Sequence, residues 1–416
     1  NTTAKHDYNV GYDFNHESAL TQSYVDRVVS YWIDEFNIDG YRLDLSKGLT
    51  QKNTLGNVSE WGKYDASRVA ILKRIADVIW EADPEAYVIL EHFSENPEES
   101  ELADYGMMLW GNLRGSFFNT AMGIASDIKW SYYKARGWNE NVVVGYMESH
   151  DEERILFEVN DRSQETYAMQ IKRLMQNAVF FFSIPGPKMI WQFGEFGYDL
   201  ELNNDRLGVK PTKWEYLEDE NRLKLFTVYQ AMINLKTKTP YLDDQYFDWQ
   251  SSGGIKWIQY KHPEVDIVIY GNFTKISQET TRYFTKTGTW YNYLTGQSVE
   301  VNDIDEKVTL SPGSFGIFSD QPIENYIEEI TEEYLTGISA PTMDPLYFYP
   351  NPTYDHIQLT TGMNWKKYEV YNLTGQLMIS GEVTNNLLDV AHLFPGTYLI
   401  KLVKKDQIAT QKLIKN

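Results

Sequence analysis

The sequence contains no cysteine, and it has far fewer basic than acidic residues. The absence of cysteine excludes disulfides, thiolate catalysis and cysteine-based metal sites, but it does not identify a compartment. Lysine and arginine number 38 against 59 aspartate and glutamate residues, which leaves a net charge of −21. A surface this acidic repels nucleic acids and anionic membranes, so it argues against both classes of partner. No apolar run approaches the roughly 18 residues of a membrane-spanning helix.

Apolar and aromatic residues are plentiful, at 42% and 15% of the 416 residues. This content is enough for large cores in about two to four domains. An acidic, aromatic-rich protein suits a neutral ligand such as a carbohydrate, which offers apolar ring faces and hydroxyl groups. The chain begins at Asn1 rather than Met and shows no signal peptide, so we expect its N-terminus to be truncated or processed.

The first 240 residues alternate between helix-like and strand-like patterns. Apolar runs predict strands at 38–43, 87–90, 107–110, 142–147 and 187–191. Amphipathic or apolar stretches predict helices near 17–36, 66–82, 117–131, 163–182 and 221–236. This alternation indicates an α/β domain with about five βα units and a parallel sheet. Charged residues end most of the strands, as they do at the active-site end of a (β/α)8 barrel, but five units are too few to close one.

The pattern changes to a period of two after Pro240. We therefore expect an antiparallel β-sandwich at 241–321, an acidic linker at 322–345 and a second all-β domain at 346–416. The linker also contains apolar residues that would suit a short helix. The last domain shows no cluster of residues that looks catalytic.

The residues that point most specifically to a reaction lie at the end of one predicted strand. Arg42 and Asp44 lie two residues apart and therefore on one face of the predicted strand at 38–43. An adjacent arginine keeps a carboxylate ionised and can hold it in one orientation. These are the requirements of a nucleophilic aspartate. A structural ion pair at a strand end is the alternative interpretation.

Two further carboxylates, Glu91 and Asp151, follow later strands, and a barrel would bring all three over one opening. Hydrolysis of a glycosidic bond with retention needs two carboxyl groups about 5–5.5 Å apart. Asp44 suits the nucleophile, and Glu91 suits an acid whose pKa is raised by an apolar surrounding. Asp151, beside His150, suits a grip on sugar hydroxyls.

Each of these pieces has a simpler interpretation. Glu91 and His92 are also compatible with a solvated strand end, and His150 with Asp151 is compatible with a helix cap. A metal site formed by Glu148, His150 and Asp151 matches no strong ligand spacing. The three carboxylates in this order fit one chemistry better than three unrelated features.

The motifs together resemble those of the α-amylase family of glycoside hydrolases. Three of them match the family's nucleophile, acid/base and third-carboxylate strands: Gly40-Tyr41-Arg42-Leu43-Asp44 with Lys47, Val88-Ile89-Leu90-Glu91-His92, and Glu148-Ser149-His150-Asp151. Two others resemble the short acidic motif before the nucleophile strand and the eighth strand: Tyr12-Asp13-Phe14-Asn15, and 186–195. The resemblance covers about residues 1–320, including the C-terminal sandwich from Tyr241.

The resemblance implies a retaining hydrolase of starch-type α-glucan, with Asp44 as nucleophile, Glu91 as acid/base and Asp151 as the third carboxylate. It also implies substrate contacts from Arg42, Lys47 and His150. Among the loop aromatics Trp61, Tyr64, Trp110 and Trp191, we expect Trp61 to stack on glucose rings and Trp110 and Trp191 to pack in the core. A transglycosylase of the branching type and a non-catalytic glucan-binding surface protein are the alternatives.

The sequence departs from the family pattern at three places. No segment matches the first motif, which supplies a substrate-binding histidine and part of a calcium site. We therefore expect barrel strands one to three to be missing, strands four to eight to remain, and residues 1–416 alone to be inactive. Gly48 and Ser149 stand where the family usually has His and Asn. At Gly48 a backbone carbonyl can still bind Ca2+ in the full-length protein, but the side-chain contact with substrate is lost. The chemistry itself requires no cofactor.

The last 70 or so residues resemble the C-terminal sorting domain of type IX secretion. Three short segments carry this resemblance: Tyr349-Pro350-Asn351-Pro352, Asn372-Leu373-Thr374-Gly375 and Pro395-Gly396-Thr397-Tyr398. It implies a bacterial protein that is secreted or displayed on the cell surface through the secretion machinery. The alternative is a generic β-sandwich that binds carbohydrate.

Overall fold

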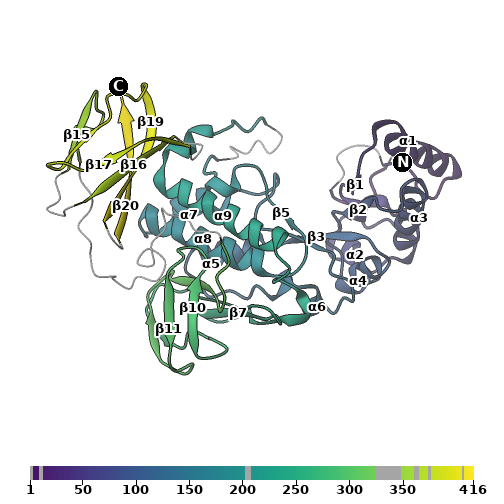
Figure 1. The fold of residues 1–416 in the computed structure, drawn as a ribbon. Helices are drawn as coiled ribbons and strands as arrows, with labels where there is room; N and C mark the ends of the chain where they lie inside the picture. The colour runs from purple at the N-terminus through teal and green to yellow at the C-terminus, as the bar shows by residue number, and fades with distance from the viewer. Residues whose placement is uncertain are drawn as a thin grey trace. The chain divides into compact units, whose positions relative to one another are not determined.

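The chain forms two compact units, residues Asn1–Ile338 and Ser339–Asn416. The computed structural model describes residues 3–8, 13–201, 208–324, 348–359, 365–372, 376–404 and 407–416 (Figure 1). The predicted linker lies outside the described residues from position 325 onward, as does Tyr12 of the short acidic motif. Within the described ranges, no helix has the length and apolar character needed to cross a membrane.

A parallel sheet of five strands organises the first unit. Its strands follow one another in chain order: β1 (Gly40–Leu43), β2 (Tyr87–Leu90), β3 (Met108–Asn112), β4 (Val143–Tyr146) and β5 (Lys188–Met189). The prediction of five βα units is confirmed, and the sheet is open, with β1 and β5 at its edges. Leu43 pairs in register with Leu90, so Asp44 and Glu91 leave their strands at the same level. The assignment of these strands to barrel positions four to eight stays a prediction.

Helices precede, separate and follow these strands. They are α1 (Ala19–Phe36), α2 (Val58–Gly62), α3 (Ala66–Ala82), α4 (Asn96–Asp104), α5 (Arg114–Ala121), α6 (Tyr133–Arg136), α7 (Ile155–Arg162), α8 (Tyr167–Ser183) and α9 (Glu220–Lys238). Asp65 starts α3 by accepting the N–H groups of Ser67 and Arg68. The predicted apolar stripe of α1 is only partly right, because Val29 and Ile33 are buried whereas Trp32 and Phe36 are exposed.

Two helix predictions differ from the structure. The helix expected at 117–131 ends at Ala121, shortly before Gly123, which has a φ of +71°. The helix expected from residue 163 starts at Tyr167 because Thr166 accepts the N–H of Met169 and caps it. Helix α7, just before it, was not predicted.

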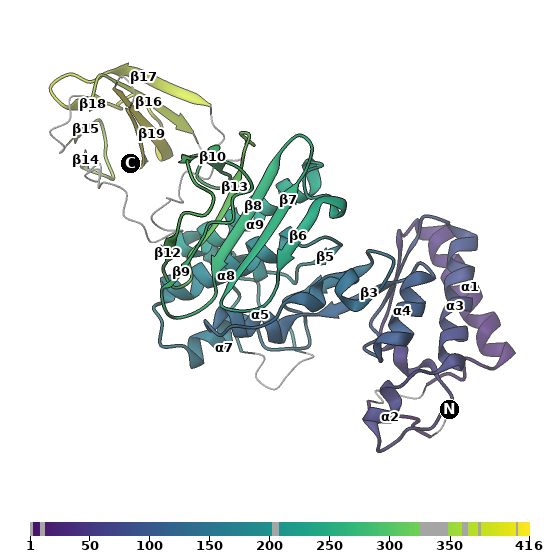
Figure 2. The same ribbon diagram turned by 90° about the horizontal axis from the view of Figure 1, so that it is seen from below.

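A six-stranded antiparallel sheet follows, with the order β11-β10-β13-β8-β7-β6. Its strands are β6 (Phe247–Gln250), β7 (Ile255–Lys261), β8 (Asp266–Asn272), β10 (Gly288–Asn292), β11 (Ser298–Val301) and β13 (Phe315–Ser319), and a ribbon of β9 (Gln278–Thr280) and β12 (Val308–Leu310) lies beside them. Figure 2 shows this sheet lying across α8 and α9, and apolar side chains of the sheet join the core of those helices. The second face covers a smaller core that includes Trp290 and Phe318. The antiparallel prediction for this segment is confirmed.

The second unit is all-β, as predicted. It contains a three-stranded sheet of β14 (Phe348–Tyr349), β15 (His356–Leu359) and β18 (Leu387–Asp389), and a four-stranded sheet of β16 (Lys367–Asn372), β17 (Leu377–Glu382), β19 (Gly396–Lys404) and β20 (Gln407–Lys415). Its own core includes Ile357, Val370 and Ile400. Of the predicted turn at 372–375, only Asn372 lies within the described residues.

Candidate active site

One guanidinium group holds two of the three predicted carboxylates. Arg42 Nη1 lies 2.6 Å from Asp44 Oδ1, and its Nη2 lies 2.8 Å from Glu91 Oε2. The guanidinium also lies over the ring of Trp110, 4.0 Å from its centroid. Aromatic stacking on one side and two carboxylates at the edge leave the arginine little freedom to rotate. Arg42 is therefore a bridge between Asp44 and Glu91 and not only the partner of its neighbour.

The pKa values of the two carboxyl groups are pushed in opposite directions. Burial raises the pKa of Glu91, whose side chain is 11% exposed, and the adjacent Asp44 carboxylate adds to this rise. For Asp44, desolvation is outweighed by the hydrogen bonds from Arg42 and Glu91 and by the charge of Arg42, so its pKa falls. A protonated Glu91 beside an ionised Asp44 is the arrangement that separates an acid from a nucleophile.

The turn after β1 supplies a further donor that the sequence does not reveal. Leu45 donates its backbone N–H to Glu91 Oε2 at 2.9 Å. Its φ is +43°, a left-handed conformation that leucine rarely adopts, so no residue-type signal predicts it. This N–H and Arg42 contact the same carboxylate oxygen, which fixes the orientation of Glu91.

The third carboxylate lies on the same side of the sheet. His150 Nε2 lies 3.4 Å from Asp151 Oδ2, and the His150 ring lies 6.3 Å from Trp110 and 5.4 Å from Trp191 between centroids. Trp110 also contacts Arg42, so one indole links the β1 motif to the β4 motif. The structure thus brings Arg42, Asp44, Glu91 and the His150–Asp151 pair to one rim.

Glu148 of the β4 motif holds the start of helix α7. Arg154 is the N-cap residue of this helix, and Glu148 Oε1 accepts the N–H of Ile155 at 2.7 Å. Glu148 also pairs with Arg154 at 3.1 Å, and its ion pair is mostly buried. Ser149, in the usual place of Asn, accepts the N–H of Asp151 at 3.1 Å and orders the turn.

Trp61 is not a sugar platform, so that prediction is wrong. Its side chain is buried, with 3% exposure, because other side chains cover the indole. His6 stacks on it at 4.5 Å between centroids, and Lys47 Nζ lies 4.2 Å from its ring centroid. The loop is polar in sequence, but His6 comes from a distant part of the chain and covers the indole.

Lys47 belongs to the same buried contact. It is 8% exposed, and its amine donates to the Phe93 carbonyl at 2.9 Å. The prediction that Lys47 contacts the substrate is therefore wrong, because its amine is not accessible. Of the other aromatics, Trp110 is buried as expected, Trp191 is half-buried against His150, and the Tyr64 hydroxyl donates to Glu101.

Gly48 lies against His6. A Cβ at Gly48 would lie 2.8 Å from His6 Nε2, so the imidazole occupies the space that a side chain at position 48 needs. Calcium prefers a cage of oxygen ligands, and a ring nitrogen here does not supply one. Among the described residues, no group of three or more histidine, aspartate or glutamate side chains could hold a metal. The described residues do not fit calcium at this position, and calcium in the full-length protein stays a prediction.

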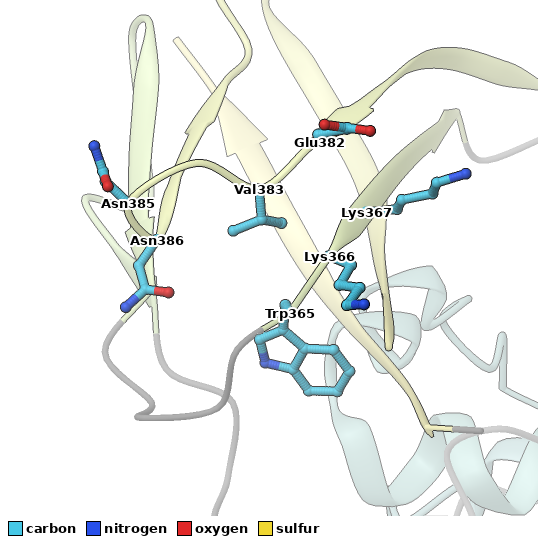
Figure 3. A pocket seen from close by; sticks show the side chains of 7 residues that line it. All are labelled: Trp365, Lys366, Lys367, Glu382, Val383, Asn385 and Asn386. Atoms are coloured by element: carbon cyan, nitrogen blue, oxygen red, sulfur yellow. The ribbon is translucent and has the colours of Figure 1, made fainter. Parts of the chain in front are cut away.

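A cavity of about 740 Å³ lies in the second unit (Figure 3). Its lining consists of Trp365, Lys366, Lys367, Glu382, Val383, Asn385 and Asn386. Glu382 is the one carboxylate among these lining residues, so this cavity lacks the pair of carboxyl groups that glycoside hydrolysis requires. The arrangement around Arg42 is the one that fits this chemistry.

Two family models match this sequence. Residues 5–259 match the alpha amylase catalytic domain, and residues 347–416 match the secretion system C-terminal sorting domain. The first match covers more than half of the chain and includes all three carboxylates. The second coincides with the all-β unit.

Individual proteins resemble the chain at low identity. The 1,4-alpha-glucan branching enzyme GlgB of Saccharophagus degradans is 22% identical over 325 residues, 70% of this chain and 43% of that enzyme. GlgB of Rhodopseudomonas palustris is 23% identical over 249 residues, 55% of this chain and 33% of that enzyme. The chain thus spans less than half the length of these two relatives.

Among solved structures, the alpha-amylase from Geobacillus thermoleovorans complexed with acarbose has a TM-score of 0.57 and 15% identity, over 76% of this chain and 70% of that one. This likeness shows a shared fold. Together with the domain match and the site geometry, it identifies the family: the chain belongs to the α-amylase family of glycoside hydrolases and carries a type IX secretion sorting domain at residues 347–416.

Proposed function

We propose that this protein hydrolyses α-glucan with retention of configuration, with Asp44 as nucleophile and Glu91 as acid/base. The observation that carries the proposal is the Arg42 bridge, with Nη–O distances of 2.6 Å to Asp44 and 2.8 Å to Glu91. It supports two carboxyl groups as close as retention requires, and the opposite pKa shifts support their different roles.

In the first step, an Asp44 carboxylate oxygen forms a bond to the anomeric carbon while the glycosidic bond breaks. Glu91 gives its proton to the departing glycosidic oxygen, and a covalent glycosyl–Asp44 ester remains. In the second step, Glu91 takes a proton from water, whose oxygen attacks the anomeric carbon and releases Asp44. His150 and Asp151 bind sugar hydroxyls, and the half-buried Trp191 beside His150 borders the same rim.

Replacing Glu91 by Gln in the full-length protein tests the proposal. The amide keeps the shape of the side chain but carries no transferable acid proton, so starch hydrolysis should disappear. Glu165→Gln is the matched control, at another glutamate that is mostly buried and pairs with an arginine, Arg173 on α8. Retained starch hydrolysis by Glu91→Gln would reject the acid assignment, and an inactive wild type would favour a non-catalytic glucan-binding protein.

Transglycosylation is the second candidate, because the relatives include branching enzymes and a sugar hydroxyl can intercept the same glycosyl ester. Product analysis with an added acceptor sugar distinguishes the two activities. Hydrolysis yields only shorter reducing sugars, whereas transfer yields a glycosylated acceptor.

A further inference from the structure

A row of buried polar side chains, joined by hydrogen bonds, leads to the main chain of Glu91. Ser46 Oγ lies 2.9 Å from His92 Nδ1, and His92 Nε2 lies 2.6 Å from Glu98 Oε1. Both Glu98 oxygens accept hydrogen bonds from Arg68, at 2.6 and 2.7 Å. The four residues are at most 1% exposed and come from the turn after β1, the end of β2, and helices α4 and α3.

The row ends on the main chain of Glu91. Ser46 donates its backbone N–H to the Glu91 carbonyl at 2.9 Å, and its Oγ lies 3.0 Å from the same carbonyl oxygen. Leu45, the residue before Ser46, donates its N–H to the Glu91 carboxylate. The position of this turn therefore decides whether the carboxylate keeps its backbone donor.

The hydrogen bonds fix the location of the protons. Glu98 receives two bonds from Arg68 and is an acceptor only, so His92 Nε2 must donate to it. Burial disfavours the charged imidazolium and lowers the pKa of His92, which leaves Nδ1 without a proton. Nδ1 and the Glu91 carbonyl oxygen are then both acceptors for the single Ser46 hydroxyl proton, which lies between them and holds the Ser46 rotamer.

Serine, histidine and glutamate in this order resemble a nucleophile, its base and the group that orients the base. Ser46 is 0% exposed, however, so no substrate reaches its hydroxyl. On the basis of the proposed function, we propose that Ser46, His92, Glu98 and Arg68 are positioning residues that align Glu91 with the glycosidic oxygen. They act through the β1 turn and not on the substrate.

The test compares Ser46→Ala, His92→Leu and His92→Asn in the full-length protein, with Ser183→Ala as the matched loss of a buried serine hydroxyl elsewhere. We expect Ser46→Ala and His92→Leu to lower kcat for starch hydrolysis by about tenfold to hundredfold, as displaced catalytic groups do. The KM should change less than about twofold, because no sugar contact is lost. His92→Asn retains an acceptor for Ser46 and should keep more activity than His92→Leu.

The pH profile separates positioning from general destabilisation. A displaced Leu45 N–H no longer favours the charged form of Glu91, so the alkaline limb of kcat/KM should move to higher pH. Ser183→Ala should leave this limb in place. If His92→Leu fails to fold, Ser46→Ala carries the same test.

The outcomes also separate this inference from the proposed function. Activity retained by Glu91→Gln would reject both. An inactive Glu91→Gln, together with folded Ser46→Ala and His92→Leu variants of unchanged kcat and alkaline limb, would reject the positioning role alone.

Discussion

Replacing Arg42 by Ala should lower activity and move the entire pH profile. Arg42 donates a charged hydrogen bond to Glu91, whose side chain is mostly buried, and another to the more exposed Asp44. A hydrogen bond to a charged group contributes about 1.5–3 kcal/mol, and solvent screens the Asp44 bond, so we count only one bond of about 2 kcal/mol. At 1.4 kcal/mol per factor of ten, kcat/KM should fall roughly 30-fold.

The direction of the pH shift follows from the charge of Arg42. Its guanidinium lowers the pKa of both Asp44 and Glu91, so its removal raises both. The acid limb of kcat/KM reports the ionisation of the nucleophile and the alkaline limb that of the acid, so both limbs should move to higher pH. Arg42→Lys retains the charge and should shift the limbs less than Arg42→Ala.

The assay is starch hydrolysis by the full-length protein across the pH range, with thermal unfolding in parallel. Arg74→Ala is the matched control: Arg74 pairs with Asp26 at 2.6 Å between α1 and α3, and its side chain is 28% exposed against 27% for Arg42. Arg74→Ala should leave both limbs in place. A loss of stability in Arg42→Ala with an unchanged pH profile would refute the reasoning. It would show that Arg42 forms a structural ion pair and does not set the pKa values of the two carboxyl groups.

Burial raises the pKa of Glu99 to about 7, against 4.5 for an ordinary glutamate. Between these pH values the folded protein holds a proton that the unfolded chain releases, so the free energy of unfolding should fall as the pH rises. Urea unfolding of Glu99→Gln should lack this decline, a difference of up to roughly 3 kcal/mol, and equal pH slopes for both proteins would contradict it. Trp61→Ala should cost about 3–5 kcal/mol of stability without raising KM beyond twofold, because the indole is buried. Trp214→Ala, at an exposed position, should cost little. A large rise in KM for Trp61→Ala at unchanged stability would show that Trp61 contacts the substrate. Removal of residues 347–416 should keep the protein inside the cell, as measured by fractionation, and its recovery outside would contradict the role of the sorting domain.

The order of the strands and the charged strand ends were predictable because they depend on local patterns. The run of apolar residues before Glu91, and the spacing of Arg42 and Asp44, follow directly from strand geometry. Contacts between distant segments were not predictable in the same way. His6 covers Trp61, Arg42 extends to Glu91 as well as to Asp44, and the turn at Leu45 adopts a conformation that its residue type disfavours.

The contact between the antiparallel sheet and helices α8 and α9 makes Pro240 a poor place to divide the protein. Tyr260 donates its hydroxyl to the Ser183 carbonyl at 2.6 Å, and Gln176 Nε2 donates to the carbonyls of Asn272 and Ser314 at 3.2 and 3.1 Å. These buried bonds accompany a continuous apolar core, so the two parts should melt as one cooperative body. A protease that cuts the chain near residue 240 would leave two fragments that stay associated and separate only in denaturant.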